Sequence, residues 1–368
     1  MMRAAVLEDL ERLVVKQVPD PAIGPGEILV RVRACAVCGS DVRIYHHGNP
    51  RVKPPQILGH EIAGDVVAVG AGVDKFKVGD RVATAADVPC GVCDYCRAGM
   101  GNDCAINYAL GYQFQGGFAE LLALNRITVD YGPVHHIPHG MSYETATLAE
   151  PLACCLNGLE RSFLAPGDSV LVIGAGPAGI LLVEAAKALG ATQDVRARHA
   201  LPLPTSSRSR RRLELARQFR ADALIATEEQ DLVEGVMAVR ARHALPLPGR
   251  GVDIAITACA SPAGGAPPEA QEQALAVIAP RGRVNYFGGL PRGSRAVALD
   301  SNVIHYKECY VHGSHGSVPR QHRVALDLLA NGQVRSEGLI THRFSLDQIA
   351  QAFAAQEQRL GLKVLVEP

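Results

Sequence analysis

Short runs of alternating apolar and polar residues occupy roughly the first third of the chain. EILVRVRA at 27–34 and EIAGDVVAVGAG at 61–72 are examples, and glycine and proline residues separate such runs. This alternation, with turn-forming residues between the runs, is typical of short strands that bury one face. The pattern predicts a twisted, barrel-like β domain in this part of the chain.

From about residue 151 the pattern changes to buried strands that alternate with helices. The predicted strands are DSVLVIG (168–174), VDIAITAC (252–259), GRVNYFG (282–288) and YVHGSHG (310–316). The first of these strands precedes a helix-like segment, PAGILLVEAAKALG. Such alternation predicts an α/β domain with a parallel, doubly wound sheet.

The end of the chain, LITHRFSLDQIAQAFAAQEQRLGLKVLVEP, offers a helix and one last strand. We expect this segment to return to the β domain. The predicted division is therefore 1–150 with 320–368 for the β domain, and 151–319 for the α/β domain. A length of 368 residues fits two domains better than one core.

Composition and charge restrict the classes of function. The formal net charge is zero, which gives no electrostatic reason to expect binding to nucleic acid or to an anionic membrane. The first residues carry acidic side chains where a signal peptide needs an apolar core, and no apolar run reaches the length of a membrane span. We therefore expect a soluble, cytoplasmic protein.

Four cysteines lie close together in the segment PCGVCDYCRAGMGNDC. The spacing C-x2-C-x2-C-x7-C belongs to Cys90, Cys93, Cys96 and Cys104. Four thiolates can fill all tetrahedral positions of one Zn²⁺, which makes such a site structural rather than catalytic. Free or disulfide-bonded cysteines are the alternative, but repeated CxxC spacing without a signal peptide favours a metal. The lobe at 88–106 is predicted to bind one structural zinc ion.

A glycine-rich turn follows the first strand of the α/β domain. The motif G-x-G-x-x-G consists of Gly174, Gly176 and Gly179, and it stands between a strand and a long apolar helix. In this context the glycines allow a tight turn, and the helix N-terminus faces the pyrophosphate of a dinucleotide. A glycine-rich turn without a ligand is the simpler alternative.

The residues after this turn depart from the usual pattern. The second strand of a dinucleotide-binding fold normally ends, about 20 residues on, in an acidic residue that binds the ribose hydroxyls. Here the count reaches Arg198. The decapeptide VRARHALPLP at 195–204 recurs at 239–248, which indicates a surface insertion, a local duplication or a sequence error. The arginines from Arg196 to Arg212 would favour NADP by binding a 2′-phosphate, or they form a solvated charge run.

A second metal site is suggested in the first domain. CGSD follows a β run, and GHE begins the next one. Cys38 and His60 offer a sulfur and a nitrogen ligand, and Glu61 or Glu150 can supply an oxygen. A reactive metal needs such a set because it leaves one position open. Taken alone, Cys38 is better explained as a buried thiol and His60 as a hydrogen-bonded histidine.

Further motifs are spread along the chain: CGSD at 38–41, GHE with the following IAGDVVAVGAGVDKFKVGDRV, GGFAE at 116–120 and GAGPAG at 174–179. With the four-cysteine segment, they make the chain resemble the zinc-dependent medium-chain alcohol dehydrogenases over nearly its whole length. AEPLACC at 149–155 makes it most similar to the polyol branch, which includes sorbitol (L-iditol) dehydrogenases. The resemblance implies a GroES-like β-barrel catalytic domain and a Rossmann dinucleotide-binding domain.

The resemblance also implies two zinc ions per chain and NAD or NADP as the cofactor. The catalytic zinc would be bound by Cys38 and His60, with Glu61 and Glu150 as direct or water-bridged acidic ligands. Which glutamate binds directly stays open. The zinc would acidify an alcohol that then gives hydride to the nicotinamide. Ser40 is implied to accept the alcohol proton, with Glu61 as the second catalytic residue.

Other positions are implied only by the resemblance. The nicotinamide would be flanked by the backbone around Phe287, Gly288, Gly313 and Ser314. The family often continues the proton relay to a histidine where this chain has Arg43, which cannot act as a base. The cofactor domain also departs from the family at AGGAPP (263–268), an insertion, and at Arg220, where a glycine is usual.

The expected activity is hydride transfer between a secondary alcohol, such as a polyol or sugar alcohol, and a nicotinamide. L-Threonine or a diol is an alternative substrate within the family. A non-catalytic member with impaired cofactor binding is an alternative of another class, and the altered second strand is its only support. Polyol relatives associate through the cofactor domain, so we expect a homodimer or homotetramer. The predicted partner is a small alcohol or ketone, with no nucleic acid and no membrane.

Overall fold

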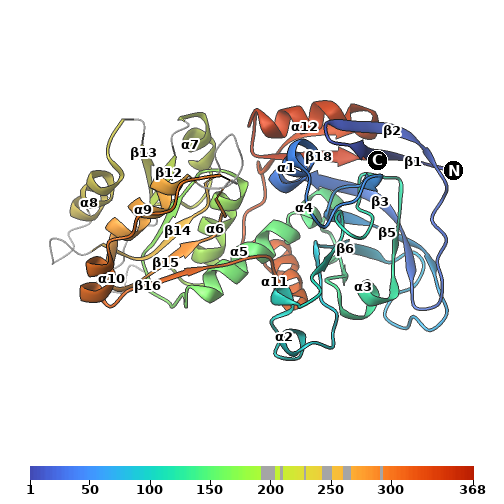
Figure 1. Ribbon diagram of the computed structural model, residues 1–368, viewed down its shortest axis with the longest axis horizontal. Helices are drawn as coiled ribbons and strands as arrows, with labels where there is room; N and C mark the ends of the chain where they lie inside the picture. The colour runs from blue at the N-terminus through green and yellow to red at the C-terminus, as the bar shows by residue number, and fades with distance from the viewer. Residues whose placement is uncertain (192–203, 208–209, 228, 243–250, 260–266, 291–292) are drawn as a thin grey trace. The chain divides into compact units, whose positions relative to one another are not determined.

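The computed structural model describes residues 1–191, 204–207, 210–227, 229–242, 251–259, 267–290 and 293–368. The chain splits into two compact units. Unit 1 comprises Met1–Cys154, Gly316–Gly332 and Ser336–Pro368; unit 2 comprises Cys155–His315 and Gln333–Arg335. Figure 1 labels the helices and strands of both units.

Unit 1 is built mainly from β-strands. Its strands are β1 (Met2–Asp9), β2 (Arg12–Val18), β3 (Ile28–Val37), β4 (Gln56–Ile57), β5 (Glu61–Val69), β6 (Arg81–Thr84), β7 (Asp87–Val88), β8 (Tyr108–Ala109), β9 (Leu121–Leu124), β10 (His135–His136), β17 (Ile340–Ser345) and β18 (Lys363–Glu367). The largest sheet has the order β10-β6-β5-β3-β18-β17, with β9 also paired to β3. This arrangement confirms the β-rich first domain that the alternating pattern predicted.

The alternation in β3 shows why the sequence forms this sheet. Ile28, Val30 and Val32 are buried, whereas Arg31 and Arg33, which alternate with Val30 and Val32 along the strand, are exposed. Because successive side chains of a strand point to opposite faces, one face of β3 joins the core and the other meets solvent. The apolar face packs with Phe118 and other buried residues into the core of unit 1.

Short helices connect the strands of unit 1. They are α1 (Gly39–His47), α2 (Asp94–Arg97), α3 (Arg126–Tyr131), α4 (Tyr143–Thr147), α11 (Pro319–Ala330) and α12 (Ile349–Glu357), with 3₁₀ turns at Gly101–Asp103 and Leu346–Gln348. Helix α5 (Ala149–Arg161) begins in unit 1 and continues into unit 2. The C-terminal strand β18 pairs antiparallel with β3, so the end of the chain joins the largest sheet of unit 1.

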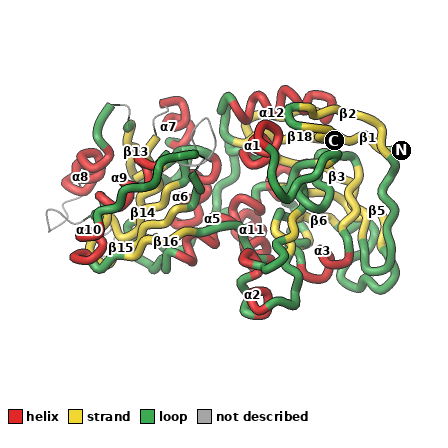
Figure 2. The backbone as a smooth tube through the Cα atoms, in the orientation of Figure 1, coloured by secondary structure: helices red, strands yellow, loops and turns green. Residues whose placement is uncertain are grey.

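Unit 2 contains one six-stranded parallel sheet with helices around it (Figure 2). Its strands are β11 (Val170–Ile173), β12 (Pro204–Ser207), β13 (Ala223–Ala226), β14 (Val252–Thr257), β15 (Ile278–Tyr286) and β16 (Tyr310–Gly313). Its helices are α6 (Pro177–Ala188), α7 (Arg210–Ala216), α8 (Leu232–Arg242), α9 (Pro268–Ala276) and α10 (Ser301–Lys307). The order β13-β12-β11-β14-β15-β16 is that of a Rossmann fold, as predicted.

The central strands of this sheet are buried on both faces. All four residues of β11 are buried, and β14 exposes little. Continuous apolar strands are typical of a parallel sheet that helices cover on both sides. Helices α6, α7 and α9 pack against β11, β12 and β14, respectively.

The second strand of the Rossmann order does not lie where the residue count placed it. β12 runs from Pro204 to Ser207 and pairs in parallel with both β11 and β13. Arg198 and the first nine residues of the repeated decapeptide lie outside the described residues, as do most of its second copy and 263–266 of the insertion. The count failed because it assumed a shorter connection after α6 than this chain has.

No helix in the described part of the chain is long and apolar enough to cross a membrane.

Arg220, which replaces the usual glycine, lies close to the buried Glu184 of α6, with 2.7 Å between Nη2 and Oε2. Its own backbone N–H also donates to Oε1 of Glu184, at 2.8 Å. A buried acidic partner therefore accommodates the arginine.

Candidate active site

The loops before α1 and β5 hold the first group of candidate residues. Cys38 directly precedes α1, and its N–H donates to Oδ2 of Asp41 at 2.9 Å. The other oxygen of Asp41 accepts the N–H of Gly59, at 3.2 Å. Asp41 is completely buried, so one carboxylate ties the CGSD and GHE segments together. This role of Asp41 was not predicted from the sequence, although Asp41 belongs to the CGSD motif.

Three of the predicted ligands come together at this point. Sγ of Cys38, a ring nitrogen of His60 and a carboxylate oxygen of Glu61 all lie within 4.8 Å of one another. Oγ of Ser40 is 3.4 Å from Nε2 of His60, and Nδ1 of His60 is 3.4 Å from Oδ1 of Asp41. A histidine oriented by a carboxylate through its second nitrogen is typical of metal sites.

Burial and charge act against each other in this group. Burial acts to lower the pKa of His60, but the Asp41 carboxylate outweighs burial and raises that pKa well above its ordinary value. Burial raises the pKa of Glu61, and the ammonium of Lys363 opposes this increase. Burial also acts to lower the pKa of Lys363, but Glu61 and Cys38 raise it to about 12. The Glu61 and Lys363 side chains form a buried ion pair.

Lys363 is the second residue that sequence reasoning missed. Its Nζ donates to Oε1 of Glu61, and both side chains are buried. Lys363 begins β18, whose neighbour β3 also pairs with β5, the strand that begins with Glu61. No local motif could have revealed the contact, because the two residues are 302 positions apart.

The donor atoms of this group fit a zinc ion. Oε2 of Glu61 is buried and has no hydrogen-bond partner in the described part of the chain. A buried carboxylate oxygen without a partner is costly, and a cation beside it removes that cost. One sulfur, one nitrogen and one oxygen ligand would also leave a fourth tetrahedral position open.

Glu150 lies apart from these three ligands. It stands in the first turn of α5, is buried, and is not a member of the group within 4.8 Å. Burial raises its pKa to about 7. The Cys154 thiol lies 3.8 Å from its Oε1. The charges of His60 and Glu61 also influence its pKa, so Glu150 belongs to the same electrostatic environment.

Tyr112 forms part of the wall around this group. Its ring is 9% exposed and lies 5.9 Å from the ring of His60, measured between centroids. Burial raises the pKa of Tyr112, while His60 and a hydrogen bond with the Ser40 side chain oppose the increase. The guanidinium carbon of Arg51 lies 4.5 Å from the centroid of the same ring. No motif in the sequence points to either residue.

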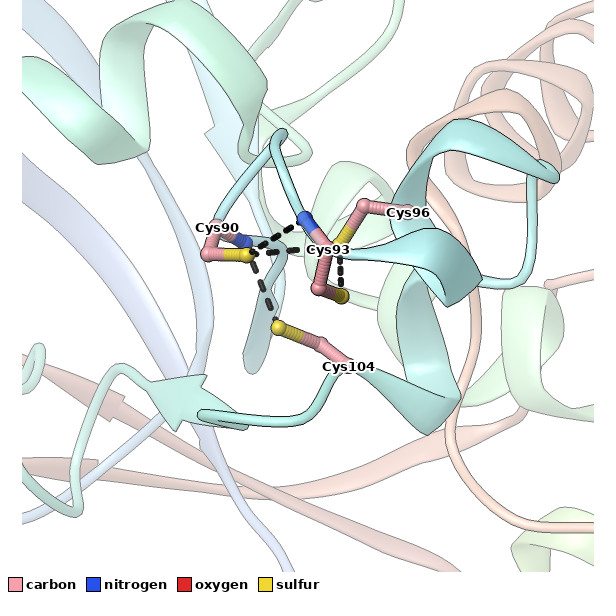
Figure 3. A group of neighbouring side chains, drawn as sticks. All are labelled: Cys90, Cys93, Cys96 and Cys104. Carbon is pink, nitrogen blue, oxygen red and sulfur yellow. Dashed lines mark hydrogen bonds between the residues drawn. The ribbon is translucent and has the colours of Figure 1, made fainter.

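The four cysteines of the lobe converge, as Figure 3 shows. Their sulfur atoms all lie within 4.8 Å of one another. Sγ of Cys96 is 3.8 Å from Sγ of Cys90 and 3.4 Å from Sγ of Cys93. A tetrahedral zinc with Zn–S bonds of about 2.3 Å has S···S edges of about 3.8 Å, so these spacings fit such an ion closely.

The lobe also stabilises thiolates. Backbone N–H groups, first that of Ala105, lower the pKa of Cys93 to about 6. The backbone N–H of Cys90 donates to Sγ of Cys104, at 3.3 Å. Burial instead raises the pKa of Cys96 to about 12. Since a metal binds thiolates, the lowered pKa values favour metal uptake at neutral pH.

The glycine-rich turn has the geometry that the motif predicts. Gly174 follows β11 with φ at 133°, and a Cβ atom there would lie 2.6 Å from the carbonyl oxygen of Ala258. A Cβ atom on Gly179 would overlap the carbonyl oxygen of Gly174. Gly176 is the N-cap of α6, with Pro177 in the first turn. The backbone therefore brings the helix N-terminus to the carboxyl end of β11, where parallel sheets bind ligands.

The other predicted cofactor residues follow β15 and β16. The N–H of Gly288 donates to the carbonyl of Thr257 at 3.1 Å, and Oγ of Ser314 donates to Oδ1 of Asn285 at 3.0 Å. Phe287 comes directly after β15, and Gly313 ends β16. Because neighbouring parallel strands end at one edge of a sheet, these residues lie at the same edge as the glycine-rich turn.

One arginine of the basic segment reaches this turn. A Cβ atom built on Gly176 would lie 3.1 Å from Nη1 of Arg212, in α7. The guanidinium of Arg212 therefore lies beside the loop that would hold the phosphates. The second strand of the Rossmann order, β12, is present in the sheet. An altered second strand was the only support for a non-catalytic protein, so that support is lost.

Comparisons with known proteins cover both units. A family profile described as "Alcohol dehydrogenase GroES-like domain" matches residues 24–131, and one described as "Zinc-binding dehydrogenase" matches residues 177–331. The chain is 33% identical over 373 residues to sorbitol dehydrogenase of Bacillus subtilis (strain 168), with 100% of this chain and 97% of that protein covered. It is 36% identical over 349 residues to L-threonine 3-dehydrogenase of Pyrococcus abyssi (strain GE5 / Orsay), covering 93% and 90% of the two proteins.

A solved structure extends this likeness to three dimensions. The crystal structure of a putative zinc-binding dehydrogenase from Sinorhizobium meliloti 1021, bound to NADP, matches with a TM-score of 0.87 and 32% identity. The match covers 100% of this chain and 99% of that one. Sequence motifs, fold and relatives agree, and the chain belongs to the zinc-binding alcohol dehydrogenases that carry a GroES-like domain.

Proposed function

We propose that this protein is a zinc-dependent NAD(P) oxidoreductase that transfers hydride between a secondary alcohol and nicotinamide. The observation that carries the proposal is the buried group of Cys38, His60 and Glu61, whose free carboxylate oxygen calls for a cation. A zinc ion, when bound there, supplies a Lewis acid that acidifies an alcohol. Glu61 is the direct acidic ligand in this proposal, because Glu150 is not a member of the group.

The residues around the group would orient the substrate and move its proton. Ser40 accepts the alcohol proton, since its hydroxyl lies 3.4 Å from Nε2 of His60 and therefore beside the candidate metal ligands. Asp41 fixes the orientation of His60. Tyr112 excludes water from one side of the group. Arg43 is exposed and cannot take the proton further, so the proton leaves through water.

The four-cysteine lobe is proposed to bind a second, structural zinc ion through Cys90, Cys93, Cys96 and Cys104. The S···S spacings and the lowered pKa of Cys93 support this assignment. With four protein ligands the ion has no open position, so its role is to stabilise the lobe.

The substrate is proposed to be a polyol or sugar alcohol, as the name of the Bacillus subtilis relative indicates. L-Threonine, named for the Pyrococcus abyssi relative, and a diol are the alternatives. A panel of polyols, diols, simple secondary alcohols and L-threonine, assayed with NAD and with NADP on the zinc-loaded enzyme, tests the proposal. Reduction of either cofactor by at least one secondary alcohol is expected. Failure of every substrate with both cofactors would contradict the proposed activity.

For the cofactor, we propose a preference for NADP. β12 ends in Ser207 instead of an acid, and the guanidinium of Arg212 lies beside the glycine-rich turn. An acid at the strand end repels a 2′-phosphate, whereas an arginine binds it through charge-assisted hydrogen bonds. Such a contact contributes on the order of 1.5–3 kcal/mol, enough for a preference of roughly ten- to a hundredfold.

Two substitutions test the cofactor preference. Ser207→Asp is expected to reverse the ratio of kcat/KM for NADP over NAD, and Arg212→Gln to lower kcat/KM for NADP alone. Arg217→Gln is the control, because Arg217 is exposed and lies just beyond the end of α7. A wild-type preference for NAD, with Arg212→Gln affecting both cofactors equally, would contradict the proposal.

A homodimer or homotetramer is proposed as well, formed through unit 2. β16 is an edge strand of the parallel sheet, and its first residue, Tyr310, is 60% exposed. An exposed edge with an aromatic side chain can pair with a second copy. Light scattering is expected to give at least twice the monomer mass of 39.0 kDa. A monomer at micromolar concentration would contradict this assembly.

A further inference from the structure

We propose that Arg51 and Tyr112 form an anchor for an anionic group, a phosphate or a carboxylate, carried by the alcohol substrate. The inference rests on the proposed function, because it names the class of alcohol that the Cys38 site would oxidise. It distinguishes a neutral polyol from a polyol phosphate or a hydroxy acid. All of the residues that carry it belong to unit 1.

Tyr112 connects the anchor to the candidate metal ligands. Its ring lies 5.9 Å from the ring of His60, whose Nε2 is 3.4 Å from Oγ of Ser40. His60 and Ser40 both belong to the group that would act on the alcohol. A substrate bound at this group would therefore have Tyr112 beside it.

Arg51 lies against the same ring. Its guanidinium carbon is 4.5 Å from the Tyr112 centroid, a distance typical of a cation–π contact. Its Nη1 donates to the carbonyl of Asn107 at 3.0 Å, and its backbone N–H donates to Oδ1 of Asn49 at 2.9 Å. The guanidinium is therefore held against the ring that also neighbours His60.

The charge of Arg51 is not neutralised by a neighbouring acid. Two other partly buried arginines of this protein have such a partner, Arg220 in Glu184 and Arg283 in Asp168, whereas Arg81, which lies over the Tyr143 ring, forms no ion pair among the described residues. Arg51, also partly buried, has no carboxylate within 4.0 Å among the residues that the structure describes.

The donors of Arg51 suit an oxyanion. A guanidinium has five N–H donors in a planar fork, of which the carbonyl of Asn107 takes one. The rest can bind a phosphate or a carboxylate in a bidentate manner, which an ammonium cannot do. An anionic group on the substrate would supply the missing counter-charge, whereas a neutral polyol would leave the cation without one.

Steady-state kinetics with a neutral pentitol, its terminal phosphate ester and a 3-hydroxy acid test the anchor. The wild-type enzyme is expected to prefer one anionic substrate over the pentitol, and the preferred anion identifies the source of the charge. Arg51→Gln should lower kcat/KM for that anion on the order of 10- to 100-fold, mainly through KM, and change kcat/KM for the pentitol less than about threefold. Arg51→Lys should retain part of the effect, because it keeps the charge but loses the fork.

Lys53→Gln is the matched control. Lys53 lies two positions from Arg51 in the same segment but is exposed, so its replacement removes the same charge without touching the ring. Its kcat/KM values should stay within about threefold of wild type for every substrate. Loss of the anion preference in this variant would indicate a diffuse effect of charge and overturn the anchor.

Two results separate failure of the anchor from failure of the proposed function. If the wild-type enzyme oxidises the pentitol best, or if Arg51→Gln lowers all substrates equally, the anchor is wrong and the oxidoreductase stands. If nothing is oxidised, calorimetric titration of the zinc-loaded protein with the pentitol phosphate and the hydroxy acid still tests the anchor. At least tenfold weaker binding of one of them to Arg51→Gln than to wild type supports it, and equal binding of both overturns it.

Discussion

The two cysteine-containing groups of unit 1 are assembled in opposite ways. The four-cysteine lobe takes all its ligands from 90–104, and two of the four sulfur-bearing residues are only half-buried. The group of Cys38, His60 and Glu61 combines two loops, and its charge is balanced by Lys363 at the other end of the chain. The lobe needs only its own segment, whereas the second group needs the completed sheet. Changes far from it in sequence should therefore disturb it.

The largest expected effect separates activity from stability. Cys38→Ser replaces the thiolate of the open group with a weak ligand and should lower kcat/KM by about 10³-fold or more, because metal acidification of the alcohol contributes several kcal/mol to the transition state. The thermal midpoint should change by no more than about 2 °C, since the lobe stays intact. Kinetics and calorimetry on the zinc-loaded protein measure both quantities. Retained turnover would contradict the role of Cys38.

Replacement of Lys363, which is distant in sequence from the metal ligands, should have the second-largest effect. Lys363→Met leaves the buried Glu61 carboxylate without its cation, and removing one member of a buried ion pair costs about 3–5 kcal/mol. Urea denaturation should detect this loss. The double variant Glu61→Gln, Lys363→Met is the control and should recover most of the stability, although not the activity. A double variant as unstable as the single one would show that the ion pair is not the cause.

In the four-cysteine lobe, loss of a ligand should lower stability and leave activity nearly unchanged. Cys93→Ser removes one ligand of the closed site and with it part of the folding free energy that the metal supplies. A loss of about 2 kcal/mol would lower the thermal midpoint by roughly 4–8 °C. At a temperature where the variant is folded, kcat/KM should remain within about threefold of wild type. Loss of activity without loss of stability would reverse the roles assigned to the two groups.

A buried pair of histidines gives the smallest expected effect. Nδ1 of His135 and Nδ1 of His322 are 2.9 Å apart. Burial first, and then Arg323, His136 and Lys75, lower the pKa of His135 to about 4, although Asp327 opposes them. Burial, together with His135, lowers the pKa of His322 well below its ordinary value. Both histidines are therefore neutral when folded.

The sign of the pH dependence follows from these lowered values. In the unfolded chain the two histidines bind protons below about pH 6.5, whereas in the folded chain His135 does not bind a proton until about pH 4. Stability should therefore decrease as the pH falls through this window. His322→Gln should reduce the slope of the urea midpoint against pH. An unchanged slope would exclude the pair as the source of the acid sensitivity.

The sequence predicted what is local or periodic. The alternation in residues 27–34 predicted β3, and the alternating strands and helices predicted the parallel sheet. The cysteine spacing and the glycine-rich turn are also local patterns. The sequence did not predict the roles of Asp41, Tyr112, Arg51 and Lys363. These roles depend on contacts between segments that only the folded sheet brings together. The second strand was misplaced because a residue count cannot measure a connection of unusual length.

Zinc content per chain tests the central claim most directly. Elemental analysis of chelator-free protein should give two zinc ions for wild type and one each for Cys38→Ser and Cys93→Ser. The ion retained by Cys93→Ser should support turnover, and the one retained by Cys38→Ser should not. One zinc or none in the wild-type protein, or two in either variant, would contradict the account.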